Sequence, residues 1–230
     1  MRILRQYNVP TGEIVVVKGE HGKLECLSLG DYGKDVNLKA DFMGLSREPL
    51  QVRHTQLLPL ERKWVITIST QYGCSMGCSF CDVPLVGPGQ NATFSDMVGQ
   101  VEAAMSLHRE VLSTDRINLH YARMGEPTFN FDVINSAHYL AGMFHAKGWG
   151  FHPVVSTMMP KGSQSAAFVS RWMLFKNEVC HGNAGLQLSI NSTDEFEREA
   201  MFNGKASSLH AIALAYPSLA SRWLTLRATM

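Results

Sequence analysis

Residues 64–81 read WVITISTQYGCSMGCSFC, and this stretch decides the predicted fold. Its first six residues are mostly β-branched or apolar and predict a buried strand. Cys74, Cys78 and Cys81 follow almost at once, in the spacing C-x3-C-x2-C. Three thiolates carried by one loop at the end of a strand can converge on a soft metal centre.

Two kinds of centre fit three cysteines. A structural zinc site needs a fourth protein ligand, which Asp82 or a histidine would have to supply. An iron–sulfur cube held by three cysteines instead leaves one iron open for a substrate or cofactor. The chain has five cysteines, an odd number, and this favours a metal site in a reducing compartment over a disulfide framework. Zinc and chance clustering remain alternatives at this point.

Downstream of the cysteines, short β-branched runs alternate with longer runs that have helical periodicity. The predicted strands are residues 64–69, 117–121, 154–156, 186–190 and 223–226.

The spacers between these strands predict amphipathic helices. The first carries Met97, Val98, Val101, Met105 and Leu112 behind the cap candidates Thr93 and Ser95; the second carries Val133, Ala137, Leu140 and Phe144 and stops at Gly148; the others lie near 164–176 and 207–216. Strands that alternate with helices predict an α/β fold with a parallel sheet and right-handed crossovers.

The N-terminal region shows a different pattern. Residues 13–18 and 23–28 are two strand-like runs on either side of a Gly-Glu-His-Gly turn, and they predict a β-hairpin. We expect a small β-rich region over residues 1–60 and a β/α unit over 61–230. A closed eight-stranded barrel takes about 250 residues, so the roughly 170 residues left after the hairpin region predict a partial, open parallel barrel.

Composition narrows the class of protein further. Of the 230 residues, 45% are hydrophobic, as a globular core requires, and the formal net charge is only +1, so there is no polybasic arm. The N-terminus has no apolar stretch typical of a signal peptide, and no run is long enough to span a membrane. We therefore expect a cytoplasmic protein.

Polar residues recur where the predicted strands end. Gly125, Glu126 and Pro127 follow the second strand: glycine lets the backbone approach a ligand, the carboxylate can hold an ammonium group, and proline fixes the turn. An ordinary Gly-Pro loop with a solvated Glu126 is the alternative. The carboxyl ends of parallel strands meet at one edge of the sheet, where ligands of such folds bind.

The next two strands end in similar fashion. Ser156 closes the third strand, and Ser189 and Asn191 close the fourth. Each of these is also an ordinary loop-capping residue, so a purely structural role stays open for all three.

Together these motifs resemble the radical SAM superfamily, and within it the family of RlmN and Cfr, which methylate adenosine in ribosomal and, for some members, transfer RNA. The resemblance rests on four stretches, together with Asn130, Pro160, Asp194, Arg198, Met201 and Asn203. The stretches are Gln71–Cys74, Met124–Pro127, Ser156–Thr157 and Leu188–Asn191.

The resemblance implies a 4Fe-4S cluster held by Cys74, Cys78 and Cys81, with S-adenosylmethionine on the open iron. Phe80 would lie near the adenine of that cofactor. The Gly125, Glu126 and Pro127 turn would hold its amino group. Ser156, Ser189 and Asn191 would add further contacts.

The implied activity is C-methylation of adenosine in rRNA or tRNA, fed by a flavodoxin-like or ferredoxin-like electron donor. Hydrogen abstraction from another substrate, or an inactive truncated iron–sulfur protein, are the alternatives.

Two positions depart from that family. Its resolving cysteine would fall at Thr67, and threonine cannot form a disulfide. Its methyl-accepting cysteine would follow a sixth strand beyond Met230, so we expect a chain that is C-terminally truncated relative to the family. No catalytic residue is assigned from the sequence.

Overall fold

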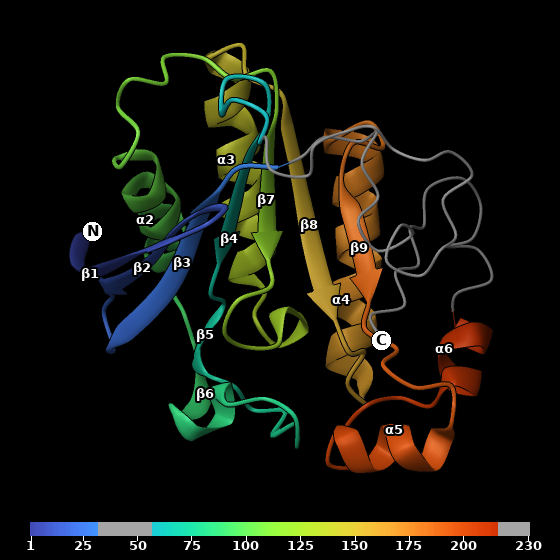
Figure 1. Ribbon diagram of the computed structural model, residues 1–230. Helices are drawn as coiled ribbons and strands as arrows, with labels where there is room; N and C mark the ends of the chain where they lie inside the picture. The colour runs from blue at the N-terminus through green and yellow to red at the C-terminus, as the bar shows by residue number, and fades with distance from the viewer. Residues whose placement is uncertain (32–56, 216–230) are drawn as a thin grey trace, which may run out of the picture.

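The computed structural model describes residues 1–31 and 57–215. Its main feature is a seven-stranded sheet in the order β1-β2-β3-β4-β7-β8-β9 (Figure 1). The four strands β4 (Trp64–Ile68), β7 (Ile117–Tyr121), β8 (Phe151–Thr157) and β9 (Gly185–Leu188) pair in parallel. The predicted α/β class with a mostly parallel central sheet is therefore confirmed.

The N-terminal strands extend this sheet rather than forming a separate one. β2 (Gly12–Lys18) and β3 (Lys23–Leu29) are the predicted hairpin, and β3 pairs antiparallel with β4 through Leu27 and Thr67. β1 (Arg2–Val9) was not predicted; it pairs antiparallel with β2 at the edge of the sheet. Its side chains are mostly exposed, so it lacks the apolar alternation that predicts a strand.

Three helices cover one face of the sheet, and all were predicted. α2 (Phe94–Met105) begins at Thr93, whose side chain forms a capping box with Asp96. α3 (Asp132–Ala146) and α4 (Ser163–Leu174) follow, and a π-helical turn (Phe175–Val179) extends α4. The placement of Leu112 on the first apolar face was wrong: it lies beyond α2 and is 85% exposed.

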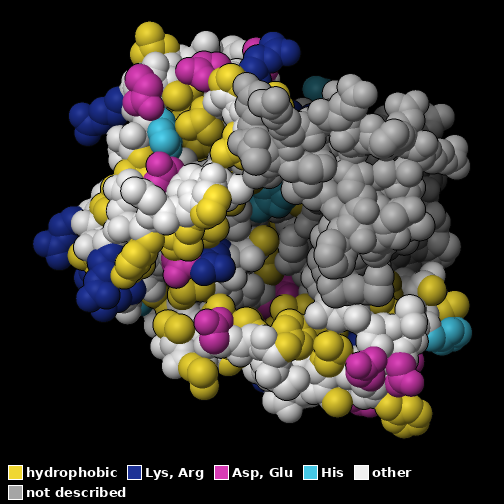
Figure 2. All heavy atoms as spheres, in the orientation of Figure 1, with side chains coloured by type: hydrophobic (Ala, Val, Ile, Leu, Met, Phe, Trp, Pro, Cys, Tyr) yellow, Lys and Arg dark blue, Asp and Glu magenta, His cyan; other side chains and the backbone are white. Residues whose placement is uncertain are grey.

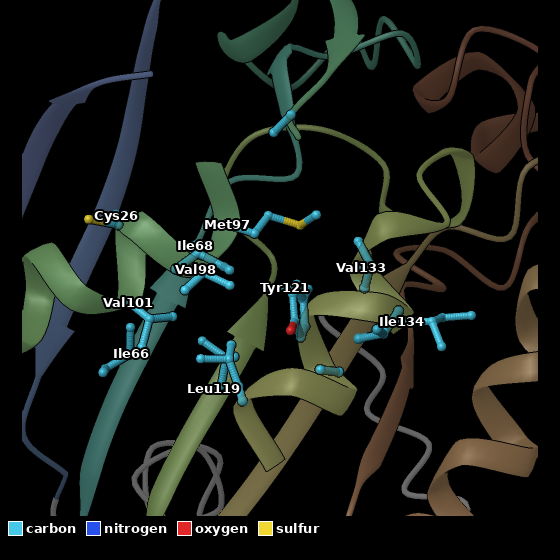
Figure 3. Packing of buried hydrophobic residues seen from close by; sticks show 14 of the residues in the cluster. Cys26, Ile66, Ile68, Met97, Val98, Val101, Leu119, Tyr121, Val133 and Ile134 are labelled. Carbon is cyan, nitrogen blue, oxygen red and sulfur yellow. The ribbon is translucent and has the colours of Figure 1, made fainter. Parts of the chain in front are cut away.

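The core lies between the helices and the apolar face of the sheet. Because side chains alternate along a strand, β4 and β7 direct Ile66, Ile68, Leu119 and Tyr121 to this side. Figure 3 shows these residues packed against Met97, Val98 and Val101 of α2 and Val133 and Ile134 of α3. The other face carries half-buried, mostly polar side chains, among them Thr67, Asn118, His120, Ser156 and Gln187.

Several short elements lie at the carboxyl edge of the parallel strands. β5 (Gln71–Gly73) and β6 (Pro88–Asn91) form a small antiparallel pair, and 3-10 turns cover Val83–Leu85 and Pro127–Phe129. α5 (Glu195–Met201) and α6 (Leu209–Ala215) follow β9. Of these elements the sequence analysis predicted only α6. The predicted fifth strand, residues 223–226, lies outside the described residues.

Among residues 1–31 and 57–215, no helix is long and apolar enough to cross a membrane.

The junction between the antiparallel and parallel parts of the sheet contains a buried polar pair. The indole N–H of Trp64 in β4 donates to Ser28 Oγ in β3 over 2.9 Å, and the two residues are each 1% exposed. Ser28→Ala removes the acceptor and leaves a buried N–H without a partner. We expect a loss of about 1–3 kcal/mol in the free energy of unfolding, measured by urea denaturation.

Ser170→Ala is the matched control, because Ser170 is exposed on α4 and donates only to Ala166 O. Equal stabilities for the two variants would contradict the role given to the Trp64–Ser28 pair.

Candidate functional site

The three clustered cysteines lie in a mostly apolar environment. Cys74 and Cys78 are 8% and 4% exposed, and Cys81 is half-buried. They pack with Met76, Phe202 and Ala206, and Met158 Sδ lies 3.4 Å from Cys78 Sγ. Burial raises the pKa of the Cys74 thiol, and it raises the pKa of Cys78 to about 12, with added repulsion from the other two cysteines. A cationic centre would stabilise these thiolates.

On one side, the cysteine loop is hydrogen-bonded to the last residue of α5 and to the segment that follows it. Ser79 N donates to Met201 O over 2.9 Å, and Lys205 Nζ donates to Ser75 O over 2.6 Å. Gly77, with a φ of +72°, lies in the left-handed region that favours glycine. These contacts join two parts of the chain that are more than a hundred residues apart in sequence.

On the other side, Gln71 joins the loop to the turn after β7. Its Oε1 accepts hydrogen bonds from Glu126 N over 3.1 Å and from Ser75 Oγ over 3.3 Å. Its Nε2 donates to Gly89 O and to Asn91 Oδ1, both over 2.9 Å. A single side chain therefore spans β5, β6 and the Gly-Glu-Pro turn.

Glu126 is fully buried at the end of β7. Its Oε1 accepts hydrogen bonds from Thr157 Oγ1 (2.6 Å), Thr128 Oγ1 (2.9 Å) and Thr128 N (3.1 Å), and its Oε2 accepts one from Met158 N (3.2 Å). Burial raises its pKa, and the hydrogen bonds oppose that shift. The alternative of a solvated Glu126 is thus excluded. Pro127, also buried, begins the 3-10 turn that carries Thr128.

The other predicted contact residues lie along the same edge. Ser156 is half-buried and donates from Oγ to Gln187 Oε1 of β9 over 2.8 Å. Ser189 N donates to Thr157 O over 2.8 Å, which keeps β8 and β9 paired at their ends. Asn191 is half-buried and has a φ of +63°, a left-handed conformation that asparagine tolerates.

A buried arginine holds these strand ends together. Arg198 of α5 is 1% exposed; it donates from Nη1 to Ile190 O (3.1 Å) and Ser189 O (3.4 Å), and from Nη2 to Met158 O (3.1 Å). Its guanidinium lies 4.7 Å from the ring centroid of Phe202. The Phe80 side chain is 51% exposed, and its ring meets the ring of Phe202 edge to face, with the centroids 5.6 Å apart.

The donor set suits an iron–sulfur cluster. Within residues 1–31 and 57–215, no three His, Cys, Asp or Glu side chains lie close enough to hold a single metal ion. A cube presents a separate iron to each cysteine, so its ligands need not meet at one point. Three free thiols from one loop, shielded by apolar side chains and repelling one another as thiolates, match that requirement.

Several site residues were missed or given no role by the sequence analysis. Gln71, Asn130 and Arg198 carried the resemblance without a function; Asn130 Nδ2 in fact donates to Thr70 O and Ala92 O. Met158 and Lys205 were missed, because contacts between distant segments leave no local pattern. The helix that presents Arg198 had a signal: Asp194, which caps α5, is followed by Glu197 three residues later.

A three-cysteine loop and a Gly-Glu-Pro turn thus lie at the carboxyl edge of the parallel strands, the arrangement on which the resemblance to radical SAM proteins rests. The sequence is homologous to dual-specificity RNA methyltransferases named RlmN. It is 30% identical to the RlmN of Solidesulfovibrio magneticus over 155 residues, which cover 65% of this chain and 40% of that protein.

Two further relatives match shorter segments. The RlmN of Halorhodospira halophila is 39% identical over 35% of this chain and 21% of its own length. The RlmN of Pseudomonas fluorescens is 32% identical over 47% of this chain and 28% of its own length. The chain thus spans about two fifths or less of these relatives. No family model matches it. The predicted relationship to the RlmN methyltransferases is confirmed.

The turn after β7 provides a test of the site's geometry. Gly125 has a φ of +98°, and a Cβ there would lie 2.6 Å from Gln71 Cβ and 2.8 Å from Gln71 N. Gly125→Ala must displace the backbone that joins the turn to the cysteine loop. We expect a loss of about 1–3 kcal/mol in the free energy of unfolding, measured by urea denaturation.

Gly142→Ala is the control, because a Cβ at this position in α3 would have nothing within 4 Å. It should gain about 0.5–1 kcal/mol. Equal stability of Gly125→Ala and Gly142→Ala would show that the turn does not pack closely against Gln71.

Proposed function

We propose that this chain is a radical SAM enzyme, similar to the RNA adenosine C-methyltransferases, whose 4Fe-4S cluster is held by Cys74, Cys78 and Cys81. One observation carries the proposal: three free, mostly shielded thiols lie on one loop at the edge where β7, β8 and β9 end. Bound together, a reduced cluster and S-adenosylmethionine supply a 5′-deoxyadenosyl radical, while the protein positions the reactants.

The residues of this chain bind and orient the cofactor in the proposal. The Oε2 of Glu126 accepts only one of the four hydrogen bonds to its carboxylate, so it keeps a lone pair for an ammonium group. A buried carboxylate whose pKa is raised by desolvation gains most from a cationic partner. Gly125 and Pro127 fix the backbone on either side of that carboxylate.

Further contacts to the cofactor would come from the neighbouring strand ends. Ser156 and Ser189 supply hydroxyl groups and Asn191 an amide, as expected for a cofactor rich in hydroxyl groups and ring nitrogens. The exposed ring of Phe80 is available to pack against the adenine. Arg198 positions this side of the site, since it binds the carbonyl groups of both strand ends.

The names of the relatives favour RNA as the substrate of this chain. Each relative described above is named an RNA methyltransferase, and this favours RNA methylation over hydrogen abstraction from an unrelated substrate. Thr67 stands in β4 on the polar face of the sheet, at the position that the resemblance gives to a resolving cysteine. No catalytic residue is assigned.

Four further expectations belong to the same proposal. They are an open, partial barrel built on the four parallel strands, the division into residues 1–60 and 61–230, a flavodoxin-like or ferredoxin-like electron donor, and a cytoplasmic location.

The chain offers a matched set of cysteine variants for the test. After anaerobic reconstitution with iron and sulfide, Cys74→Ala, Cys78→Ala and Cys81→Ala should each lose most of the cluster and all formation of 5′-deoxyadenosine from S-adenosylmethionine under dithionite. Cys26→Ala and Cys180→Ala remove the other two free thiols and should keep both properties. Iron analysis and chromatography of the products give the readouts. A well-loaded wild-type protein that forms no 5′-deoxyadenosine would contradict the proposal.

A further inference from the structure

Three cations form a row across the N-terminal strands. Arg2 of β1 lies directly opposite Lys18 of β2, and Lys18 lies directly opposite Lys23 of β3. Directly opposite residues in antiparallel strands point to the same face and lie about 5 Å apart. All three side chains are exposed. Figure 2 shows dark-blue Lys and Arg side chains gathered over the end of the molecule that β1 and β2 form.

This row is unfavourable for the isolated protein. Like charges placed directly opposite on neighbouring strands destabilise a sheet, and here two such pairs share Lys18. None of the three cations forms an ion pair within the part of the chain that the structure describes. Two acidic residues close by in the sequence are already engaged: Glu20 accepts a hydrogen bond from Thr93, and Glu25 pairs with Arg123. A polyanion with closely spaced charges would remove the repulsion.

The row lies beside the cysteine loop. The turn between β2 and β3 contacts Tyr72, two residues before Cys74: His21 N donates to Tyr72 Oη over 3.2 Å, and the two rings meet edge to face at 5.7 Å. Tyr72 Oη donates to Asp96 over 2.6 Å, and Asp96 also accepts from Glu20 N over 3.0 Å. A ligand bound along the row is therefore next to the loop that carries the proposed cluster.

We propose that Arg2, Lys18 and Lys23 bind the phosphate backbone of the RNA substrate and guide it toward the carboxyl edge of the sheet. The inference rests on the proposed function, which supplies RNA as the partner. Backbone phosphates are the anions that such a row fits, because they recur at short intervals along the strand and are bound by Lys and Arg without regard to sequence. The strand pairing fixes the spacing of the three residues along the sheet, so the backbone needs no rearrangement on binding.

The test uses the full, reconstituted chain and a fluorescein-labelled RNA hairpin, with binding followed by fluorescence anisotropy over a series of salt concentrations. Lys18→Gln removes the central cation. It should weaken binding at every salt concentration and make the negative slope of log K against log salt shallower by about 1. Lys18→Gln with Lys23→Gln should make the slope shallower by about 2.

Arg109→Gln is the matched control, because it removes one positive charge just as Lys18→Gln does. Arg109 is exposed in the segment after α2, next to His108, which contacts Glu13 and Trp64 at the opposite edge of the sheet. It should bind RNA as the wild type does. The melting temperature of Lys18→Gln should equal or exceed that of the wild type, because two like-charge pairs are removed.

Two measurements separate the inference from the function on which it rests. Formation of 5′-deoxyadenosine without RNA reports the cofactor site alone and should be unchanged in Lys18→Gln. If Lys18→Gln binds RNA as tightly as Arg109→Gln does, the row is not an RNA site. The same conclusion follows if Lys18→Gln weakens binding to vesicles of anionic phospholipid but not to RNA. Either result overturns the inference, whatever the cofactor assay shows.

Discussion

The site depends on two buried, charged side chains that fasten the ends of the parallel strands. Glu126 joins the end of β7 to the end of β8 through Thr157 and Met158, and Arg198 joins the end of β8 to that of β9 through Met158, Ser189 and Ile190. Burying either group without partners would be costly, so their hydrogen bonds fix where the strand ends lie. The carboxyl ends of β7, β8 and β9 are thus held together by buried hydrogen bonds.

The cysteine loop is placed against this edge by residues that are distant in sequence. Gln71 holds it to the backbone of Glu126, while Met201 at the end of α5 and Lys205 beyond it hold the other side. The thiols face apolar neighbours from the same segments. Burial, together with the charges that the other two cysteines would carry as thiolates, raises the pKa of Cys78 to about 12. Stability of this loop and binding of a cationic centre are thus expected to be coupled.

The elements of the fold that could be predicted from the sequence are those whose apolar residues recur at a regular spacing. The four described parallel strands, α2, α3, α4 and the hairpin have apolar residues at a clear period, and the C-x3-C-x2-C spacing marked the cysteine loop. β1 escaped prediction because an exposed edge strand has no apolar alternation. β5 and β6 are too short for a pattern. The roles of Gln71, Met158 and Lys205 arise from contacts between distant segments, which periodicity does not encode.

The proposed function requires that Cys74, Cys78 and Cys81 hold a 4Fe-4S cluster with an iron open to S-adenosylmethionine. Electron paramagnetic resonance of the reconstituted, dithionite-reduced protein, recorded with and without S-adenosylmethionine, tests this requirement. We expect the signal of a reduced 4Fe-4S cluster that changes when S-adenosylmethionine is added, since the cofactor would bind the open iron. A cluster signal that is the same with and without S-adenosylmethionine would contradict it.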